Sequence, residues 1–353
     1  MRTALKAAAL AAAMGFSFYR LQAGGERSML VVFGTVLGVL ASFSLVSLAL
    51  RLRKASMAEE IWNRTETWWW MVAVSMLAFS THRLVSFVFL GFLCFSALRE
   101  FYSLMPMKSL SGDVGLAFKD RTVVLVTYLW VPALVYVAYI HWYELFIILV
   151  PVYLFLLIPI LFVLQGRTEG AVRSLGIIAL GVMFFVFNLG HTLFMINLSP
   201  LLLLFCFGLT EGRDVVAFWT GKALAGLAGI TAGSRWAKLV SAPIAASINP
   251  RKTWAAGLVS ALAVAAMALL FVPMLPPLGP ENLRPSPLFC AAVGFLIGLL
   301  GLAGDLVFGM IKRDLRVKDT GDLLPGHGGL IDRVNSLIFT VPVTFHLFYW
   351  RFF

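Results

Sequence analysis

The sequence is poor in charged residues. Asp, Glu, Lys and Arg together make up 13% of its 353 residues, whereas a soluble domain has about 25%. Cysteine is scarce as well: Cys94, Cys206 and Cys290 each lie in an apolar stretch without CxxC spacing. These absences argue against a soluble globular domain, a disulfide framework and a cysteine zinc site. The short alternating segments typical of a membrane β-barrel are also missing.

Long apolar runs are what the sequence has instead. It is 60% hydrophobic with a mean hydropathy of +0.91, and runs of about 20 apolar residues can cross a bilayer as helices. We therefore predict an all-α, polytopic membrane bundle of about 9–10 transmembrane helices. The predicted spans are 28–50, 68–80, 84–102, 123–140, 143–164, 174–196, 199–219, 255–277, 288–311 and 334–350. We expect a break at His82-Arg83, because one helix over 68–102 would be about 50 Å long.

The first twenty residues have two interpretations. They combine basic residues with a short apolar stretch of small residues, as in a cleaved signal peptide. A retained membrane or interfacial helix would have the same pattern. Residues 1–67 as a whole are predicted to be N-terminal membrane segments, and they contain no recognisable motif.

The net charge of +11 is distributed unevenly between the predicted loops. If the spans alternate in direction, most Lys and Arg residues fall on one face, together with loops 220–254 and 312–333. The positive-inside rule places that face in the cytoplasm. We interpret the charge as topology and contact with anionic lipid head groups rather than nucleic-acid binding. We therefore expect a bacterial inner-membrane protein with its active site on the cytoplasmic side.

The predicted span 288–311 carries its small and polar residues on one face. The positions that recur at helical spacing are Gly294, Gly298, Gly301, Asp305, Gly309, Lys312 and Arg316. The glycines allow a second backbone to approach closely. Asp305 lies about 10 Å below Lys312, and a carboxylate at that depth is costly unless it is paired or coordinated. It is either in a salt bridge, with Lys312 or a base on another helix, or a metal ligand.

The loop after this span combines bases, a glycine turn and acids. The stretch "KRDLRVKD" presents four bases to anions: Lys312, Arg313, Arg316 and Lys318. The stretch "PGHGG" predicts a tight turn with exposed backbone N–H groups. Asp332 follows at the start of the last helix. An acid pair, Asp305 and Asp332, together with bases and a glycine turn suits a polyphosphate substrate with Mg²⁺.

Two shorter stretches add polar groups on the same predicted face. In "EGRDVVAFWTGK", Asp214 lies near the end of a span and Lys222 lies beyond it. In "NPRKTW", Arg251 and Lys252 are placed to hold a phosphate. Thr253 either caps the following helix or contributes to the same phosphate site.

In order and spacing, these stretches resemble the signature of the phosphatidate cytidylyltransferases, also called CDP-diacylglycerol synthases. The stretch "KRDLRVKDTGDLLPGHGGLIDRVN" carries most of the resemblance, which is strong over 205–350. The resemblance implies a membrane domain over 68–353, with its catalytic part in 205–350. It implies transfer of CMP from CTP to phosphatidate or a related anionic lipid, with release of pyrophosphate. It also implies Mg²⁺, and it leaves a second metal ion and a homodimer open.

The resemblance implies roles for individual residues. Catalytic roles fall on Asp305, Asp332, Lys312, Arg313, Lys318 and Asp319. Substrate-binding roles fall on Asp214, Lys222, Arg251, Lys252, Thr253, His327, Gly328, Gly329 and Arg333. Asp305 and Asp332 would hold the metal. His327 is expected to shape the turn rather than to move a proton, because a lipid phosphate is already an anion at neutral pH.

The chain departs from the family pattern at three positions. Phe308 and Gly309 stand where the family has Glu-Ser, and Asn335 stands where it has Asp. We expect reduced CTP-dependent activity, which Gly309→Ser combined with Asn335→Asp should raise. Two alternatives remain: transfer to another lipid such as a polyprenol, or a non-catalytic transporter or lipid-binding paralogue. Transporters often have broken helices in both halves, whereas the polar motifs here are concentrated in the C-terminal part, which favours the enzyme.

Overall fold

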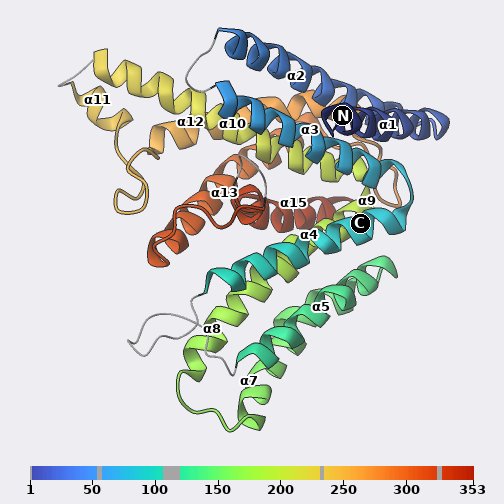
Figure 1. Cartoon of the computed structure of the whole chain (residues 1–353), viewed down its shortest axis with the longest axis vertical. Helices are drawn as coiled ribbons and strands as arrows, with labels where there is room; N and C mark the ends of the chain where they lie inside the picture. The colour runs from blue at the N-terminus through green and yellow to red at the C-terminus, as the bar shows by residue number, and fades with distance from the viewer. Residues whose placement is uncertain (1, 54–57, 106–119, 231–233, 324–327) are drawn as a thin grey trace.

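The computed structural model describes residues 2–53, 58–105, 120–230, 234–323 and 328–353 (Figure 1). The described residues form helices and no β-strand. In chain order the helices are α1 (Arg2–Ala23), α2 (Arg27–Leu52), α3 (Ala58–Ser80), α4 (Arg83–Leu104), α5 (Arg121–Tyr139), α6 (Tyr143–Ile148), the π-helix η2 (Leu149–Leu154), α7 (Phe155–Leu164), α8 (Ala171–Gly181), the π-helix η3 (Val182–Asn188), α9 (Leu189–Leu198), α10 (Pro200–Ile230), α11 (Arg235–Val240), α12 (Trp254–Phe271), the 3₁₀-helix η4 (Val272–Met274), α13 (Pro287–Asp314), α14 (Ile331–Val334) and α15 (Leu337–Phe352).

Seven segments of the described residues are long and apolar enough to cross a membrane. They are Arg27–Leu52, Arg83–Leu104, Arg121–Tyr139, Tyr143–Leu164, Ala171–Leu198, Trp254–Met274 and Pro287–Asp314. Each coincides with a predicted span; of the other three, 68–80 lies within α3, 199–219 coincides with the first part of α10, and 334–350 begins at the end of α14 and covers most of α15. Helices satisfy their own backbone hydrogen bonds, which is why they can cross a lipid bilayer. The prediction of an all-α, polytopic membrane bundle is confirmed.

The predicted break between the two short spans is present. Helix α3 ends at Ser80 and α4 begins at Arg83. Between them, His82 has an extended backbone, and its Nδ1 accepts a hydrogen bond of 3.1 Å from the Leu84 N–H. This bond caps α4, because it satisfies one of the backbone donors that have no partner in the first turn.

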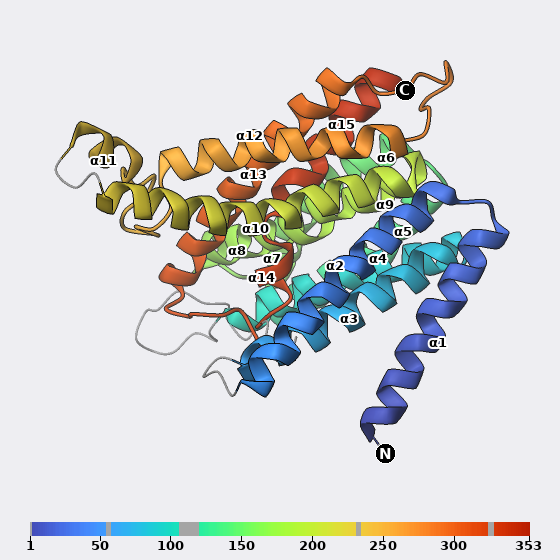
Figure 2. The same ribbon diagram turned by 90° about the horizontal axis from the view of Figure 1, so that it is seen from above.

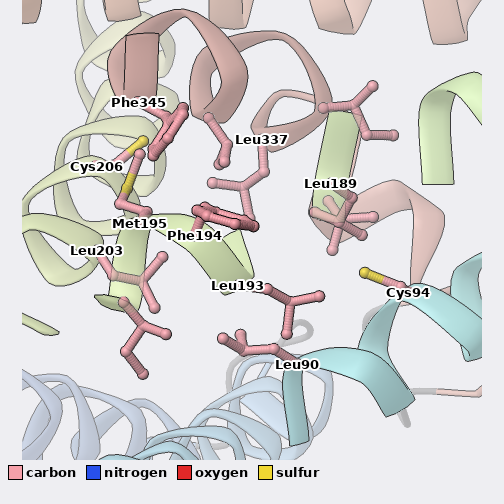
Figure 3. Packing of buried hydrophobic residues seen from close by; sticks show 14 of the residues in the cluster. Leu90, Cys94, Leu189, Leu193, Phe194, Met195, Leu203, Cys206, Leu337 and Phe345 are labelled. Carbon is pink, nitrogen blue, oxygen red and sulfur yellow. The ribbon is translucent and has the colours of Figure 1, made fainter. Parts of the chain in front are cut away.

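An apolar core formed by α4, α9, α10 and α15 occupies the centre of the bundle (Figure 3). There, Leu90 of α4 lies beside Leu193 of α9. Helices α1, α2 and α3 pack together at one side, away from α12 and α13 (Figure 2). The three cysteines, Cys94, Cys206 and Cys290, are buried as free thiols. The core thus connects the N-terminal and C-terminal halves of the described chain.

Helix α13 packs against α12 with almost no side chains between the two backbones. A Cβ at Gly294 would lie 2.7 Å from Ala268 Cβ, and a Cβ at Gly298 would lie 2.5 Å from Ala261 Cα. These distances leave no room for a side chain, so the predicted close approach at the glycines is confirmed. The contact sets the position of α13, and therefore of Asp305, relative to α12.

We expect Gly298→Ala to destabilise the protein, because the added methyl group would press on the α12 backbone. Overpacking of this kind lowers the free energy of unfolding by about 1–3 kcal/mol. The matched control is Gly38→Ala in α2, where an added Cβ meets nothing within 4 Å. Thermal unfolding in detergent measures both variants. Equal melting temperatures for native protein and Gly298→Ala would show that the α12–α13 contact is not tightly packed.

Candidate active site

Polar residues from several elements meet around Asp305 of α13. Lys252, just before α12, lies against Asp305 in the second half of α13. Ile248 lies 3.1 Å from the position that a Cβ at Gly309 would take. The 312–333 loop returns to this end of α13, where Lys312 pairs with a carboxylate of α14. The two loops predicted to carry the chemistry therefore lie at the same end of the bundle.

The carboxylate of Asp305 is paired with a buried arginine. Arg213 of α10 is fully buried, and its Nη1 and Nη2 donate to Asp305 Oδ2 at 2.7 and 2.8 Å. Nη1 also pairs with Asp214. A Cβ at Gly301 would lie 3.2 Å from Arg213 Cδ, so this glycine of α13 makes room for the arginine. A charge removed from water in this way requires opposite charges beside it, and both aspartates supply them.

Three further groups bind Asp305. Lys252 Nζ donates to Oδ2 at 2.5 Å, and on the other side Asn335 Nδ2 donates to Oδ1 at 3.3 Å. The Ser336 hydroxyl is 3.4 Å from Oδ1. Of the interpretations open for Asp305, a salt bridge to bases on other elements is present, whereas Lys312 binds elsewhere.

Asp332 of α14 forms a second acid–base pair. Lys312 Nζ donates to its Oδ1 at 2.8 Å, and the Thr320 N–H donates to its Oδ2 at 2.9 Å. Burial alone would raise the pKa of the Asp332 carboxyl. The hydrogen bonds from Lys312 and Thr320 outweigh burial, so the pKa lies below its usual range. Asp332 is therefore ionised at neutral pH and is held beside the end of α13.

The glycine turn before α14 is bound by an acid from the other half of the chain. Gly328 has a φ of +81°, a conformation that favours glycine. Just after the turn, the N–H groups of Leu330 and Ile331 donate to the carboxylate of Glu100 at the end of α4. Glu100 could not be identified from the sequence, because a single acid at the end of an apolar helix gives no distinguishing signal.

Of the remaining predicted site residues, one caps a helix, one lies over aromatic rings, and most of the others are exposed. Thr253 caps α12 by accepting a hydrogen bond of 3.2 Å from the Ala256 N–H, so its predicted capping role is confirmed. Lys222 Nζ lies over the rings of Phe218 and Trp219 at 5.4 and 5.9 Å. The other exposed predicted residues are Asp214, Arg251, Arg313, Lys318 and Asp319. Arg333 is partly buried, and His327 lies outside the described residues.

The three departures from the family pattern have distinct surroundings. Phe308 is buried against Phe184 and Phe185 of η3, with ring centroids 5.6 and 6.0 Å apart. It faces a neighbouring helix. Gly309 faces Ile248, so a serine there would press on this side chain before reaching a phosphate. Asn335 donates to Asp305, and aspartate in its place would put two carboxylates together.

The described carboxylates do not form a magnesium site from protein ligands alone. Within the described residues, no group of three or more His, Cys, Asp or Glu side chains could hold a metal ion. Asp305 and Asp332 each contact a different lysine. Mg²⁺ usually takes one or two carboxylates and completes its coordination with water and substrate phosphates. A magnesium ion bound here would complete its coordination with water or with phosphate oxygens of a substrate.

The low pKa of Asp332 predicts a pH-dependent contribution to stability. The pKa of Asp332 is lower in the folded protein than in the unfolded chain. Its contribution to the free energy of unfolding is therefore fully present above the ordinary carboxyl pKa of about 3.9, and it is lost as the pH falls through the pKa of the folded protein. The difference in melting temperature between native protein and Asp332→Asn should therefore be largest near neutral pH and shrink below about pH 4. Asp322→Asn, an exposed change in the same loop, is the control. A difference that stays constant with pH would contradict the pairing.

Comparison with known proteins gives matches of different extent. The family model described as "Cytidylyltransferase family" matches residues 62–351. Uncharacterized protein YnbB of Escherichia coli (strain K12) is 30% identical over 294 residues, which cover 81% of this chain and 87% of that protein. Phosphatidate cytidylyltransferase of Synechocystis sp. is 52% identical over 56 residues, 16% of this chain and 19% of that protein. Phosphatidate cytidylyltransferase of Rickettsia bellii is 29% identical over 153 residues, 43% of this chain and 58% of that protein.

The matched range contains every element that carries the polar cluster. It begins within α3 and ends within α15, so it includes Arg213, Lys252, Asp305 and Asp332. The chain spans less than two thirds of the two phosphatidate cytidylyltransferases named above, and the likeness to them is correspondingly local. The family model, in contrast, matches well over half of the chain, and on that ground the chain belongs to the cytidylyltransferase family.

Proposed function

We propose that this protein is a CTP-dependent lipid nucleotidyltransferase that transfers CMP to phosphatidate, forming CDP-diacylglycerol and pyrophosphate in phospholipid biosynthesis. Membership of the family and the names of the phosphatidate cytidylyltransferase relatives support it. The observation that carries the proposal is the cluster around Asp305. It joins an acid of one membrane span to bases from two other elements at the polar end of the bundle.

The proposed reaction brings two anions together. A phosphate oxygen of the lipid forms a bond to the α-phosphorus of CTP, and the bond from that phosphorus to the oxygen bridging to the β-phosphate breaks. Pyrophosphate leaves with the electron pair of that bond. The lipid phosphate is already ionised, so no strong base is required. Positive charge and fixed orientation are the main requirements, and Lys252 and Lys312 lie where they can provide both.

Magnesium is part of the proposal. Asp305 and Asp332 would hold Mg²⁺ together with phosphate oxygens of CTP, and the ion would neutralise part of the phosphate charge. Arg213 would keep Asp305 ionised and oriented, because its buried guanidinium donates to that carboxylate through two nitrogens. Asn335 would add a neutral hydrogen bond to Asp305 where the family has a second acid.

A second acceptor is favoured by one observation. Phe308 replaces a family acid and is buried among aromatic rings of η3, one turn from Asp305. This change removes an acid from the helix that carries Asp305 and replaces it with packing between α13 and η3. A polyprenyl phosphate, which offers the same nucleophilic oxygen on a bulkier lipid, is the alternative acceptor to be tested.

The activity prediction uses purified protein in detergent with labelled CTP and Mg²⁺. We expect CMP transfer to phosphatidate, with polyprenyl phosphate tested in parallel. Asp305→Asn and Lys252→Gln should each lower the rate about 100-fold, a typical loss for a group that stabilises transition-state charge. Glu281→Gln, in the exposed loop before α13, is the control. Melting temperatures establish that the variants remain folded.

The outcomes of this assay separate the candidates. Transfer to phosphatidate that depends on Asp305 supports the proposed reaction, and transfer only to polyprenyl phosphate supports the alternative acceptor. If folded native protein neither transfers CMP to either lipid nor binds CTP with Mg²⁺, the enzyme proposal is wrong. A non-catalytic membrane role would then account better for the chain.

We also propose that the polar end faces the cytoplasm of a bacterial inner membrane, where CTP is found. Arg235→Cys and Asp322→Cys place thiols in the loops at this end, and Glu281→Cys places one in the loop before α13. The native cysteines are buried and should contribute little background. In intact cells, a membrane-impermeant thiol reagent should label only Glu281→Cys. Labelling of Arg235→Cys or Asp322→Cys before the cells are permeabilised would show that the proposed orientation is wrong.

A further inference from the structure

A carboxylate at the end of α4 accepts hydrogen bonds from three described residues that precede and follow 324–327: Thr320, Leu330 and Ile331. Glu100 Oε1 accepts from the Thr320 hydroxyl at 2.7 Å and from the Ile331 N–H at 3.0 Å. Its Oε2 accepts from the Leu330 N–H at 2.8 Å. Two of these donors are backbone groups at the start of α14, the helix that carries Asp332. A single side chain thus holds the loop at three points.

The glycines of this loop leave the space that the carboxylate fills. A Cβ at Gly329 would collide with Glu100 Oε1 and the Thr320 hydroxyl, and it would lie 2.7 Å from the Gly321 nitrogen. A Cβ at Gly321 would lie 3.4 Å from Glu100 Cδ. Real Cβ atoms do not approach other atoms as closely as the first of these contacts, so the loop conformation and the position of Glu100 depend on each other.

Thr320 connects Glu100 to Asp332. Its hydroxyl lies 2.7 Å from Glu100 Oε1 and 3.0 Å from Asp332 Oδ2, while its N–H donates to Asp332. A hydroxyl has only one proton to donate. Because the N–H already serves Asp332, the hydroxyl proton is best used by Glu100. One residue therefore binds both acids, and a shift of the loop away from Glu100 would move the donor that holds Asp332.

We infer that Glu100 is a positioning residue of the active site, which fixes the glycine turn and, through Thr320, the carboxylate of Asp332. Glu100 acts through Asp332 and is not itself placed on a substrate. The inference assigns a role to α4, an element outside the motifs that carry the family resemblance. The catalytic part of this inference rests on the proposed function, whereas its structural part can be measured without turnover.

The structural part is tested by hydrogen–deuterium exchange with mass spectrometry. We expect Glu100→Ala to expose the amides of Leu330 and Ile331, so that peptides covering 328–334 exchange at least tenfold faster while α12 and α13 are unchanged. Glu100→Gln should give an intermediate result, because one amide oxygen can accept while the NH₂ group faces a donor. Glu281→Ala is the matched control. Unchanged protection in Glu100→Ala would overturn the inference.

Gly329→Ala provides a second route to the same effect. It leaves Glu100 intact and displaces it by adding a methyl group where the carboxylate lies. If Glu100 positions the loop, this variant should accelerate exchange in the same peptide as Glu100→Ala does. The control is Gly15→Ala in α1, where an added Cβ meets nothing within 4 Å. Acceleration in Glu100→Ala but not in Gly329→Ala would contradict the mutual fit of the loop and the acid.

The catalytic part is tested by a double-mutant cycle on CMP transfer. Glu100→Ala should lower kcat about 10- to 100-fold, the size of effect expected from slight misplacement of a catalytic group. The double variant Glu100→Ala with Asp332→Asn should be no slower than Asp332→Asn alone, because both changes remove the same contribution. Losses that multiply would show that Glu100 acts independently of Asp332 and would overturn the inference. If exchange responds but native protein has no activity, the proposed function fails while the structural role of Glu100 stands.

Discussion

A buried positive charge determines how the polar end of the bundle is built. Arg213 is fully buried between α10 and α13, where a lone guanidinium would be unstable. Asp305 and Asp214 balance it, and Lys252 adds a second positive charge to the same cluster. Two acids and two bases are thus in direct contact. Nearby, Lys312 and Asp332 form a pair of their own, so both groups are close to electrically neutral.

This neutrality has a consequence for polyphosphate binding. Because Arg213, Lys252 and Lys312 already have carboxylate partners, part of their positive charge is balanced before a nucleotide binds. In the proposed reaction, a divalent ion or the exposed bases, such as Arg251, Arg313 and Lys318, would add to the charge of Lys252 and Lys312. For the proposed function, this arrangement favours binding of a cation together with the anionic nucleotide.

The parts of the structure that follow from local chemistry could be predicted from sequence. The helical spans follow from apolar runs, and the glycine contact of α13 follows from residues repeated on one helix face. The capping role of Thr253 was one of two roles considered for it. Spacing along a helix identifies a face, but it does not identify the neighbour that meets that face. This is why Arg213 and Glu100 were missed and why the contact between Gly309 and Ile248 was not predicted.

The contact between Glu100 and the 320–331 loop also affects how the protein is made. Chains are synthesised from the N-terminus, and domains generally form in that order. The acid on α4 is made 220 residues before Thr320 and 230 residues before Leu330. Until these partners are synthesised, Glu100 lacks the three donors that it binds in the folded protein. Completion of the last loop therefore adds a polar contact to the apolar core that already connects the two halves, and a chain that stops before it leaves this contact unmade.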